Sequence, residues 1–367
     1  MLRPEVSRLN WRKSSLIAAT HLSSSKNTAS PFQMGSMARN ASTSVRIAIV
    51  GDVHDVWDPV KDEKALQYIK PDLLLFTAGD FGDENVELVK DVSRLNFPKA
   101  VILGNHDSWW TSGPFRRYKV NADGGPVGVR MQLEALGESH VGYSRLDFPS
   151  LGLSVVGGRP FSSGGKRIWS QELLADIYGV TDLKTSAERI IEHASTAPIG
   201  HSLIFLCHNG PTGLGSRCQD ICGRDWVLAG GDHGDSDLQE ALNSVQKIHG
   251  RKIPLVVFGH MHKSLQMGLG ERTMLVSGTD GIIYLNGAVV PRVKRGVIFD
   301  SSSKVRNSQF HDKGSVKGYS SSLKRHFTVV DLVDNAVAKI VENWVSVAEN
   351  TCQGAETILY MREGVDL

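Results

Sequence analysis

The sequence VILGNHDSWW at residues 101–110 contains the feature around which the chain is organised. An apolar run in this stretch ends at Gly104. Three polar residues follow it at once: Asn105, His106 and Asp107. The run is typical of a strand buried in a parallel sheet, and ligands of open α/β sheets bind at the carboxyl ends of such strands. Asn, His and Asp are also common in turns, so this stretch alone fits an ordinary loop equally well.

The same design, an apolar strand followed by ligand-type residues, occurs four more times in the chain. Five strands that end in Asp, His or Asn are not explained by composition. We therefore expect these ends to meet and to form a site. The four further strands and their polar ends are 47–50 with Asp52 and His54, 73–76 with Asp80, 203–207 with His208, and 255–258 with His260 and His262.

The composition is that of an ordinary globular protein. The 367 residues are 41% hydrophobic and 22% charged, which allows one large core or two domains. No apolar run approaches the roughly 18 residues of a membrane helix, so we expect no membrane partner. Four cysteines are too few for a disulfide scaffold, and we expect reduced thiols. Cys218 and Cys222 are four residues apart, so a regulatory disulfide or a zinc clip between them is an alternative.

Residues 1–43 differ from the rest of the chain. They hold six basic residues, nine serines and a single acid, a bias typical of an organelle transit peptide. We expect import into the chloroplast, with the mitochondrion and a merely disordered tail as alternatives. Without this segment, 41−6 basic and 39−1 acidic residues give a net charge of −3. The formal charge of +2 therefore does not indicate a nucleic-acid partner.

Strands and helices alternate in the first part of the chain, which predicts a parallel sheet with right-handed crossovers. Beyond His262 the pattern changes to short strands, which predicts antiparallel strands of a second sheet. The fold class is α/β (α+β). The expected strands are 45–50, 73–78, 100–103, 153–157, 203–207, 255–258, 273–277, 281–285, 327–332 and 336–345, and the expected helices are 62–70, 84–94, 130–136, 171–178, 185–195 and 237–249.

One domain, 44–350, is predicted, with two inserts and a C-terminal tail at 351–367. The first insert, 212–237, is rich in glycine and reads as lid-like. The second, 292–325, has nine basic and two acidic residues and many serines. It predicts a mobile surface loop or a basic flap that attracts a phosphate-rich substrate. A further surface loop, 111–126, is expected beside the site.

Seven polar side chains at the strand ends offer three oxygen and four nitrogen ligands. Residues two apart in an extended segment point the same way, so Asp52 and His54 can reach one metal ion. The carboxylate of Asp80 can bridge two ions. Mixed nitrogen and oxygen ligation without thiolate suits two divalent ions, Mn, Fe or Zn. The predicted ligands are Asp52, His54, Asp80, Asn105, His208, His260 and His262.

Two divalent ions about 3.5–4 Å apart can clamp both oxygens of a phosphoryl displacement and lower the pKa of bound water to about 7. This predicts cleavage of a phosphate ester by a metal-bound hydroxide. His106 is left over and is suited to protonate the leaving group or to bind a phosphate oxygen. Asp107 is expected to orient that imidazole. A buried hydrogen-bonding role is the alternative for His106.

The chain contains, in this order, Asp52-x-His54, Gly79-Asp80, Gly104-Asn105-His106-Asp107, the His208 motif and Gly259-His260-x-His262. These motifs resemble those of the calcineurin-like metallophosphoesterase superfamily. The forms Asn-His-Asp-Ser-Trp-Trp at 105–110 and Cys-His-Asn-Gly-Pro at 207–211 resemble, more narrowly, a branch found in cyanobacteria and plants. The resemblance implies a four-layer αββα sandwich of two mixed β-sheets flanked by helices. It implies one metal site from Asp52, His54, Asp80 and His262, and a second from Asp80, Asn105, His208 and His260.

The sequence departs from the family pattern at two places. Asp55 stands where the first motif usually ends in glycine, and it could contact a ligand or a lid. Asp83, Glu84 and Asn85 stand where protein Ser/Thr phosphatases of the family have Asp-Arg-Gly. The phosphate-binding arginine is missing, which argues against a phosphoprotein substrate. Asp83 also replaces the tyrosine ligand of purple acid phosphatases, so no tyrosinate–iron colour is expected.

The sequence therefore predicts a two-metal phosphohydrolase that acts on a phosphorylated small molecule, as a monoesterase or a diesterase. One alternative is a binding module that keeps the fold without catalysis. Another is a nuclease, which rests on the basic 292–325 segment alone. The intact set of ligands favours the enzyme, because a scaffold does not need them.

Overall fold

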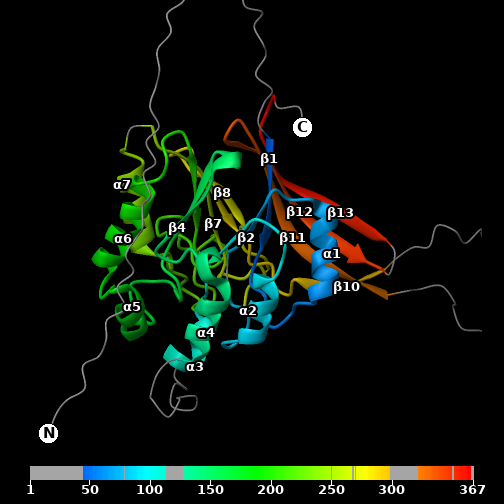
Figure 1. Ribbon diagram of the computed structural model, residues 1–367, viewed down its shortest axis with the longest axis horizontal. Helices are drawn as coiled ribbons and strands as arrows, with labels where there is room; N and C mark the ends of the chain where they lie inside the picture. The colour runs from blue at the N-terminus through cyan, green and yellow to red at the C-terminus, as the bar shows by residue number, and fades with distance from the viewer. Residues whose placement is uncertain are drawn as a thin grey trace, which may run out of the picture. The chain divides into compact units, whose positions relative to one another are not determined.

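The computed structural model describes residues 44–77, 79–112, 127–248, 250–266, 268, 270–297, 321–348 and 351–364. Over these ranges the chain forms two mixed β-sheets with helices beside them (Figure 1). The predicted transit peptide, most of the predicted 111–126 loop and the middle of the basic insert, 298–320, lie outside the described residues. In the part of the chain that is described, no helix has the length and apolar character needed to cross a membrane.

The first sheet combines strands from both ends of the chain. Its order is β13-β12-β11-β1-β2-β3, and β10 also pairs with β11. β1, β2 and β3 are parallel, whereas the other pairings are antiparallel. The strands are β1 (Ser44–Val50), β2 (Leu73–Phe76), β3 (Lys99–Val101), β10 (Val293–Val297), β11 (Ser321–Val333), β12 (Ala336–Val347) and β13 (Cys352–Met361).

The second sheet comes from the middle of the chain. Its order is β4-β5-β6-β7-β9-β8. The four central strands are parallel, and β4 and β8 pair antiparallel at the two edges. The strands are β4 (Arg145–Phe148), β5 (Leu153–Gly157), β6 (Ser202–Leu206), β7 (Lys252–Phe258), β8 (Leu275–Ser277) and β9 (Ile283–Asn286).

Helices cover the outer faces of both sheets, α1 against β12 and β13 and α6 against β5 (Figure 1). Local side chains cap the N-termini of α1, α2 and α6. Asp58 accepts the Lys61 amide at 3.0 Å before α1, and Asp182 forms a capping box with Thr185 at the start of α6. The helices are α1 (Pro59–Ile69), α2 (Val86–Ser93), α3 (Trp109–Ser112), α4 (Val127–Leu136), α5 (Gln171–Tyr178), α6 (Leu183–Ser195) and α7 (Ser236–Val245).

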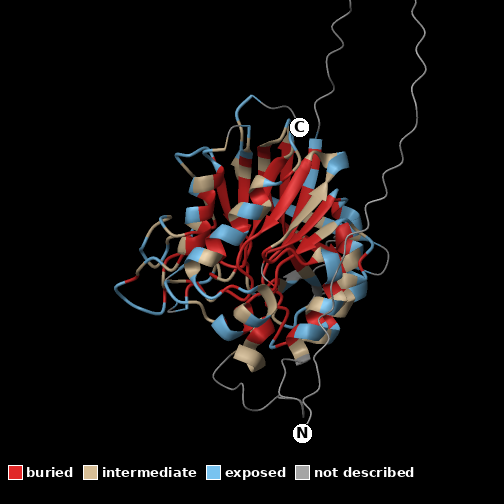
Figure 2. Cartoon of the chain, turned by 60° about the vertical axis from the view of Figure 1, so that its left-hand side comes forward, coloured by how far each residue is buried: buried red, intermediate tan, exposed pale blue. Residues whose placement is uncertain are grey.

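The central strands are buried on both faces, as Figure 2 shows. Successive side chains of a strand point to opposite faces. Ile47 and Ile49 of β1 pack in one cluster with Leu255 and Val257 of β7, so the two sheets lie face to face. Ala48 belongs to the other cluster, which includes the buried side chains of the helices. The four-layer sandwich of two mixed sheets flanked by helices is thereby confirmed.

The prediction that residues 351–367 form a C-terminal tail is wrong for most of this range, because β13 lies within it. β13 pairs antiparallel with β12 over the register Lys339↔Met361 to Val347↔Cys352. It is an edge strand, and most of its side chains are exposed or half-buried. An edge strand has only one neighbour and little buried surface, so its sequence lacks the apolar alternation that marks a half-buried strand.

The prediction that the strands after His262 form a second sheet of their own is wrong. β8 and β9 complete the sheet of β4–β7, whereas β10 to β13 complete the sheet of β1–β3. The basic insert is also shorter than predicted, because β10 and β11 occupy its two ends. Local patterning indicates that a segment is extended, but the partner of each strand is set by packing between distant segments.

Candidate metal centre

The predicted ligands follow the carboxyl ends of five parallel strands, and the structure brings them together. Three of these strands, β1, β2 and β3, belong to one sheet, and β6 and β7 belong to the other. The site is therefore built by both sheets. Its ligand-type side chains form three overlapping groups, in each of which the candidate ligand atoms lie within 4.8 Å of one another.

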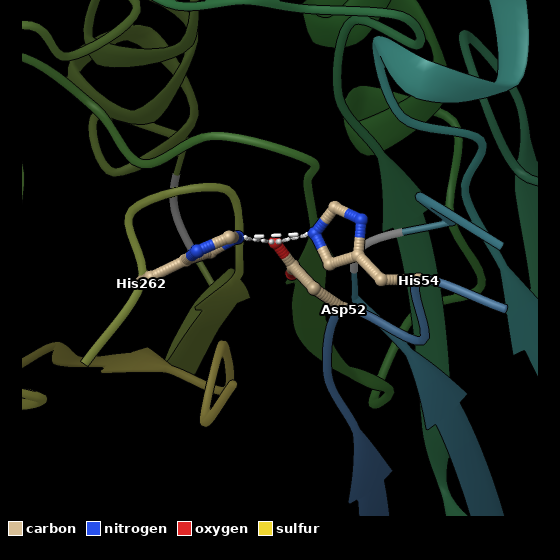
Figure 3. A group of neighbouring side chains, drawn as sticks. All are labelled: Asp52, His54 and His262. Carbon is tan, nitrogen blue, oxygen red and sulfur yellow. Dashed lines mark hydrogen bonds and ion pairs between the residues drawn. The ribbon is translucent and has the colours of Figure 1, made fainter. Parts of the chain in front are cut away.

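The first group joins Asp52, His54 and His262 (Figure 3). Asp52 Oδ2 lies 3.2 Å from Nε2 of His262 and 3.8 Å from Nε2 of His54. The two ring nitrogens are 3.1 Å apart. Asp52 is buried, and among the described residues its Oδ2 has no hydrogen-bond partner. A buried oxygen without a partner beside two converging ring nitrogens is a donor set that fits a divalent cation.

The second group joins Asp80, His208 and His260. Nε2 of His208 lies 3.6 Å from Asp80 Oδ1 and 2.8 Å from Asn105 Oδ1. Nε2 of His260 lies 3.1 Å from the Ser163 carbonyl oxygen, to which it can donate. In that tautomer Nδ1 of His260 carries a lone pair, as a metal ligand requires.

A third group joins Asp80 with His54 and His106. Asp80 thus lies near ligands of both other groups, which is the position of a carboxylate shared by two ions. Its Oδ1 also accepts the amide of His106 at 2.9 Å, which fixes the carboxylate. His106 was predicted to lie beside the metal ions without binding them. Its place in this group means that a measurement of metal content in a His106 variant tests that prediction directly.

Three candidate ligands have an uncommon backbone conformation. His54, Asp80 and His260 have φ angles of 43°, 24° and 66°. Residues other than glycine rarely adopt positive φ, and such strain persists mainly at functional sites. The sequence gives no sign of it, because glycine precedes each motif but the strained residue is the ligand itself.

Glycines before the ligands allow close approach of neighbouring segments. A Cβ on Gly104 would lie 2.2 Å from Asp80 Oδ1. A Cβ on Gly51 would lie 1.9 Å from the carbonyl oxygen of Gly287. Gly51 therefore makes room for the segment that follows β9.

Burial and neighbouring charges shift the pKa values of four candidate ligands. Burial lowers the pKa of His208 and that of His260, so both rings are held neutral, the form that binds a metal ion. Burial opposes the charge of Asp52, but contact with His262 and with His54 lowers its pKa below the usual range. Burial likewise opposes the charge of His262, but its contact with Asp52 raises the pKa of the imidazole.

The imidazole of His106 is oriented by Asp83, and the predicted role of Asp107 is corrected. Nδ1 of His106 lies 2.7 Å from Asp83 Oδ1, and the ring stacks on Trp109 at 4.9 Å between centroids. The two oxygens of Asp107 instead accept the backbone amides of Gly104 and Phe81, at 2.8 and 3.0 Å. The Asp107 side chain is buried among these amides. It therefore does not contact the His106 imidazole, although the two residues are adjacent in sequence.

The two departures from the family pattern contact each other. Asn85 Nδ2 donates to Asp55 Oδ1 at 2.6 Å. Asn85 also caps α2, since its Oδ1 accepts the Leu88 amide at 3.1 Å. The extra carboxylate of Asp55 therefore connects the loop after His54 to the start of this helix.

The glycine-rich insert 212–237 is in contact with the site. His233 lies nearly parallel to His260, with ring centroids 6.3 Å apart, and its Nε2 is 2.7 Å from the same Ser163 carbonyl oxygen. Arg272 holds the insert: its Nη1 donates to the carbonyl of Gly223 at 2.6 Å and its Nε to that of His262 at 3.0 Å. Nothing in the local sequence Asp232-His233-Gly234-Asp235 predicts the contact of His233 with the candidate metal ligand His260.

The four cysteines do not contribute to the site. All four lie among the described residues as free thiols, and no disulfide joins Cys218 to Cys222. Cys222 is buried, whereas Cys218 is half-buried.

Comparison with known proteins agrees with the motifs. The sequence profile of the family described as calcineurin-like phosphoesterase matches residues 45–264, more than half of the chain. No curated protein matches the sequence. Among solved structures, a conserved uncharacterized protein of Streptococcus pneumoniae, a predicted phosphoesterase, is similar at 11% identity, over 86% of this chain and 100% of that one, with a TM-score of 0.29. That likeness is too weak to carry an argument, and the assignment rests on the profile: the chain belongs to the calcineurin-like phosphoesterase family.

Proposed function

We propose that the protein is a two-metal phosphohydrolase that cleaves an ester bond of a phosphorylated small molecule. The observation that carries the proposal is the pair of ligand groups on either side of Asp80. A single carboxylate near two sets of imidazoles is the arrangement that a dinuclear centre needs. The family and the candidate ligands support metal-dependent cleavage of phosphoesters in general, and the choice of a small-molecule ester is our own.

The metal ligands fall into two sets. Asp52, His54 and His262 would hold one ion, and His208, His260 and Asn105 the other, with Asp80 between them. Two divalent ions, Mn, Fe or Zn, would supply a water of lowered pKa and would neutralise the charge of the phosphoryl oxygens.

His106 would act on the leaving group or on a phosphoryl oxygen. Its side chain is 31% exposed, so one edge of the ring can reach a substrate. Asp83 accepts from Nδ1, which leaves Nε2 directed to another partner. The parallel face of Trp109 restricts rotation of the ring. These contacts support a role for His106 as the proton donor to the leaving oxygen, which develops charge in the transition state.

The experiment that tests the function is a panel of phosphate monoesters and diesters. The protein is freed of metal by chelation and then loaded separately with Mn, Zn or Fe. We expect hydrolysis with at least one metal and none in the metal-free protein. Phosphate release that is equal before and after chelation contradicts a two-metal mechanism. Binding of the esters without any release supports a non-catalytic module of the same fold.

We also propose that residues 1–43 direct import into a plastid. The support is their basic, serine-rich and acid-poor composition. A fusion of this segment to a fluorescent reporter is expected to accumulate in chloroplasts. Accumulation in mitochondria would correct the compartment, and a cytosolic reporter would show that the segment is not a targeting signal.

A further inference from the structure

An exposed tryptophan of the insert is connected to the metal centre by two ring contacts. Trp226 is 42% exposed. It meets His233 edge-to-face, with centroids 4.8 Å apart and an angle of 87° between the rings. His233 in turn lies against the candidate ligand His260. A large aromatic ring exposed beside a catalytic centre offers a flat apolar surface to whatever projects from that centre.

Arg224, two residues earlier, is a cation without a carboxylate partner among the described residues. Its guanidinium rests on Gly231, where a Cβ would lie 2.2 Å from Nη2. Its Nε is buried and has no hydrogen-bond partner in the described part of the chain. The buried arginines nearby differ, since Arg159 pairs with Asp235 at 2.6 Å and Arg272 with Asp225 at 3.3 Å.

The backbone pairs the segment of Arg224 with the segment of His233. The Arg224 amide donates to the Gly231 carbonyl at 2.9 Å, and the His233 amide donates to the Cys222 carbonyl at 2.9 Å. Arg224 therefore lies on the segment paired with the one whose imidazole separates Trp226 from His260. A half-buried cation loses hydration, and a bound anion compensates for that loss.

We propose that Trp226 and Arg224 form a subsite for the leaving group, which takes a planar ring that carries a negative charge. The proposal rests on the proposed phosphohydrolase function and narrows its substrate class to esters of ring-containing, anionic alcohols. Stacking on Trp226 selects the ring, and Arg224 selects the charge. A ring stacked on an aromatic side chain is worth roughly ten-fold or more in affinity.

Three phosphate monoesters of arylmethyl and alkyl alcohols separate the two contributions. They are 6-carboxy-2-naphthylmethyl phosphate, 6-methyl-2-naphthylmethyl phosphate and ethyl phosphate. All three leave as alkoxides, so differences in kcat/KM report recognition more than chemistry. We expect the carboxylated ester to be the best substrate and ethyl phosphate the poorest, with each step roughly ten-fold.

Single variants assign the steps. Trp226→Ala is expected to abolish the preference for the methylnaphthyl ester over ethyl phosphate, and Trp226→Phe to keep most of it. Arg224→Gln is expected to abolish the preference for the carboxylate over the methyl group and to leave the preference for the ring. Matched controls are Leu228→Ala, which truncates another exposed side chain of the insert, and Arg217→Gln, which removes the charge of an exposed arginine of the same insert. Both controls should keep both preferences.

Calorimetry on the metal-loaded protein measures how tightly the corresponding non-hydrolysable phosphonates bind. This measurement distinguishes failure of the proposed subsite from failure of the proposed phosphohydrolase function. If the phosphonates show the same two preferences but no ester is hydrolysed, the function fails and the subsite stands. If esters are hydrolysed but neither Trp226→Ala nor Arg224→Gln changes the preferences beyond its control, the subsite is overturned and the function stands.

Discussion

Replacing Asp80 by alanine is expected to remove both metal ions and to lower phosphoesterase activity by at least about 10³-fold. The carboxylate lies near ligands of both metal groups, so its loss weakens both sites at once. It also accepts the amide of His106, so the variant loosens the segment that carries the proposed acid. Elemental analysis of the purified protein and of the variant, together with rates on the best ester, measures the two effects.

Asp80→Asn separates charge from shape. The amide keeps an oxygen acceptor for the His106 amide but lacks the charge that two cations share, so we expect metal loss close to that of the alanine variant. Asp72→Asn is the matched control, because Asp72 lies just before β2, at the opposite end of that strand from Asp80, and its side chain accepts the backbone amide of Arg46. One ion retained in both Asp80 variants would show that Asp80 serves a single site. A metal-free wild-type protein with full activity would end the two-metal proposal.

The fold was predictable where local pattern and packing agree. The apolar runs of β1, β2, β6 and β7 are fully buried over most of their length, so their composition alone marks them as strands. β13 gave no such signal, since its side chains are mostly exposed and its backbone is paired on one side. The division of the late strands between the two sheets was also beyond the sequence, because β9 pairs with β7 and β11 with β1 across long chain separations.

The candidate ligands were predictable for a different reason. Each one follows a buried strand within a few residues, so the topology of the sheets brings them together. The residues that support the ligands follow no such rule. Asp83 reaches His106 across 23 positions, and His233 reaches His260 from a glycine-rich insert. Asp107 shows the converse error: it is next to His106 in the chain, but its carboxylate accepts backbone amides in the interior.

The leaving-group dependence of His106 follows from the proposed proton transfer. An alkoxide is a poor leaving group and needs a proton in the transition state, and general acid catalysis contributes about 10²–10⁴-fold. A nitrophenolate is stable enough to leave with little help. His106→Asn is therefore expected to slow hydrolysis of an alkyl ester far more than that of a nitrophenyl ester. If His106 only bound phosphoryl oxygens, the variant would slow the hydrolysis of both esters equally.

Asp83 should act through the imidazole, and its variant should show the same pattern more mildly. Asp83→Asn keeps an acceptor near Nδ1 but removes the charge that stabilises the protonated ring, which we expect to cost about ten-fold on the alkyl ester and little on the nitrophenyl ester. Asp107→Asn is the matched control, because among the described residues the Asp107 carboxylate accepts only backbone amides. Any loss of rate in this variant should be equal on both esters.

Metal content measured in parallel decides whether His106 is an acid or a metal ligand. Metal retained in His106→Asn agrees with an acid beside the ions, whereas metal lost from that variant makes His106 a ligand, together with His54 and Asp80.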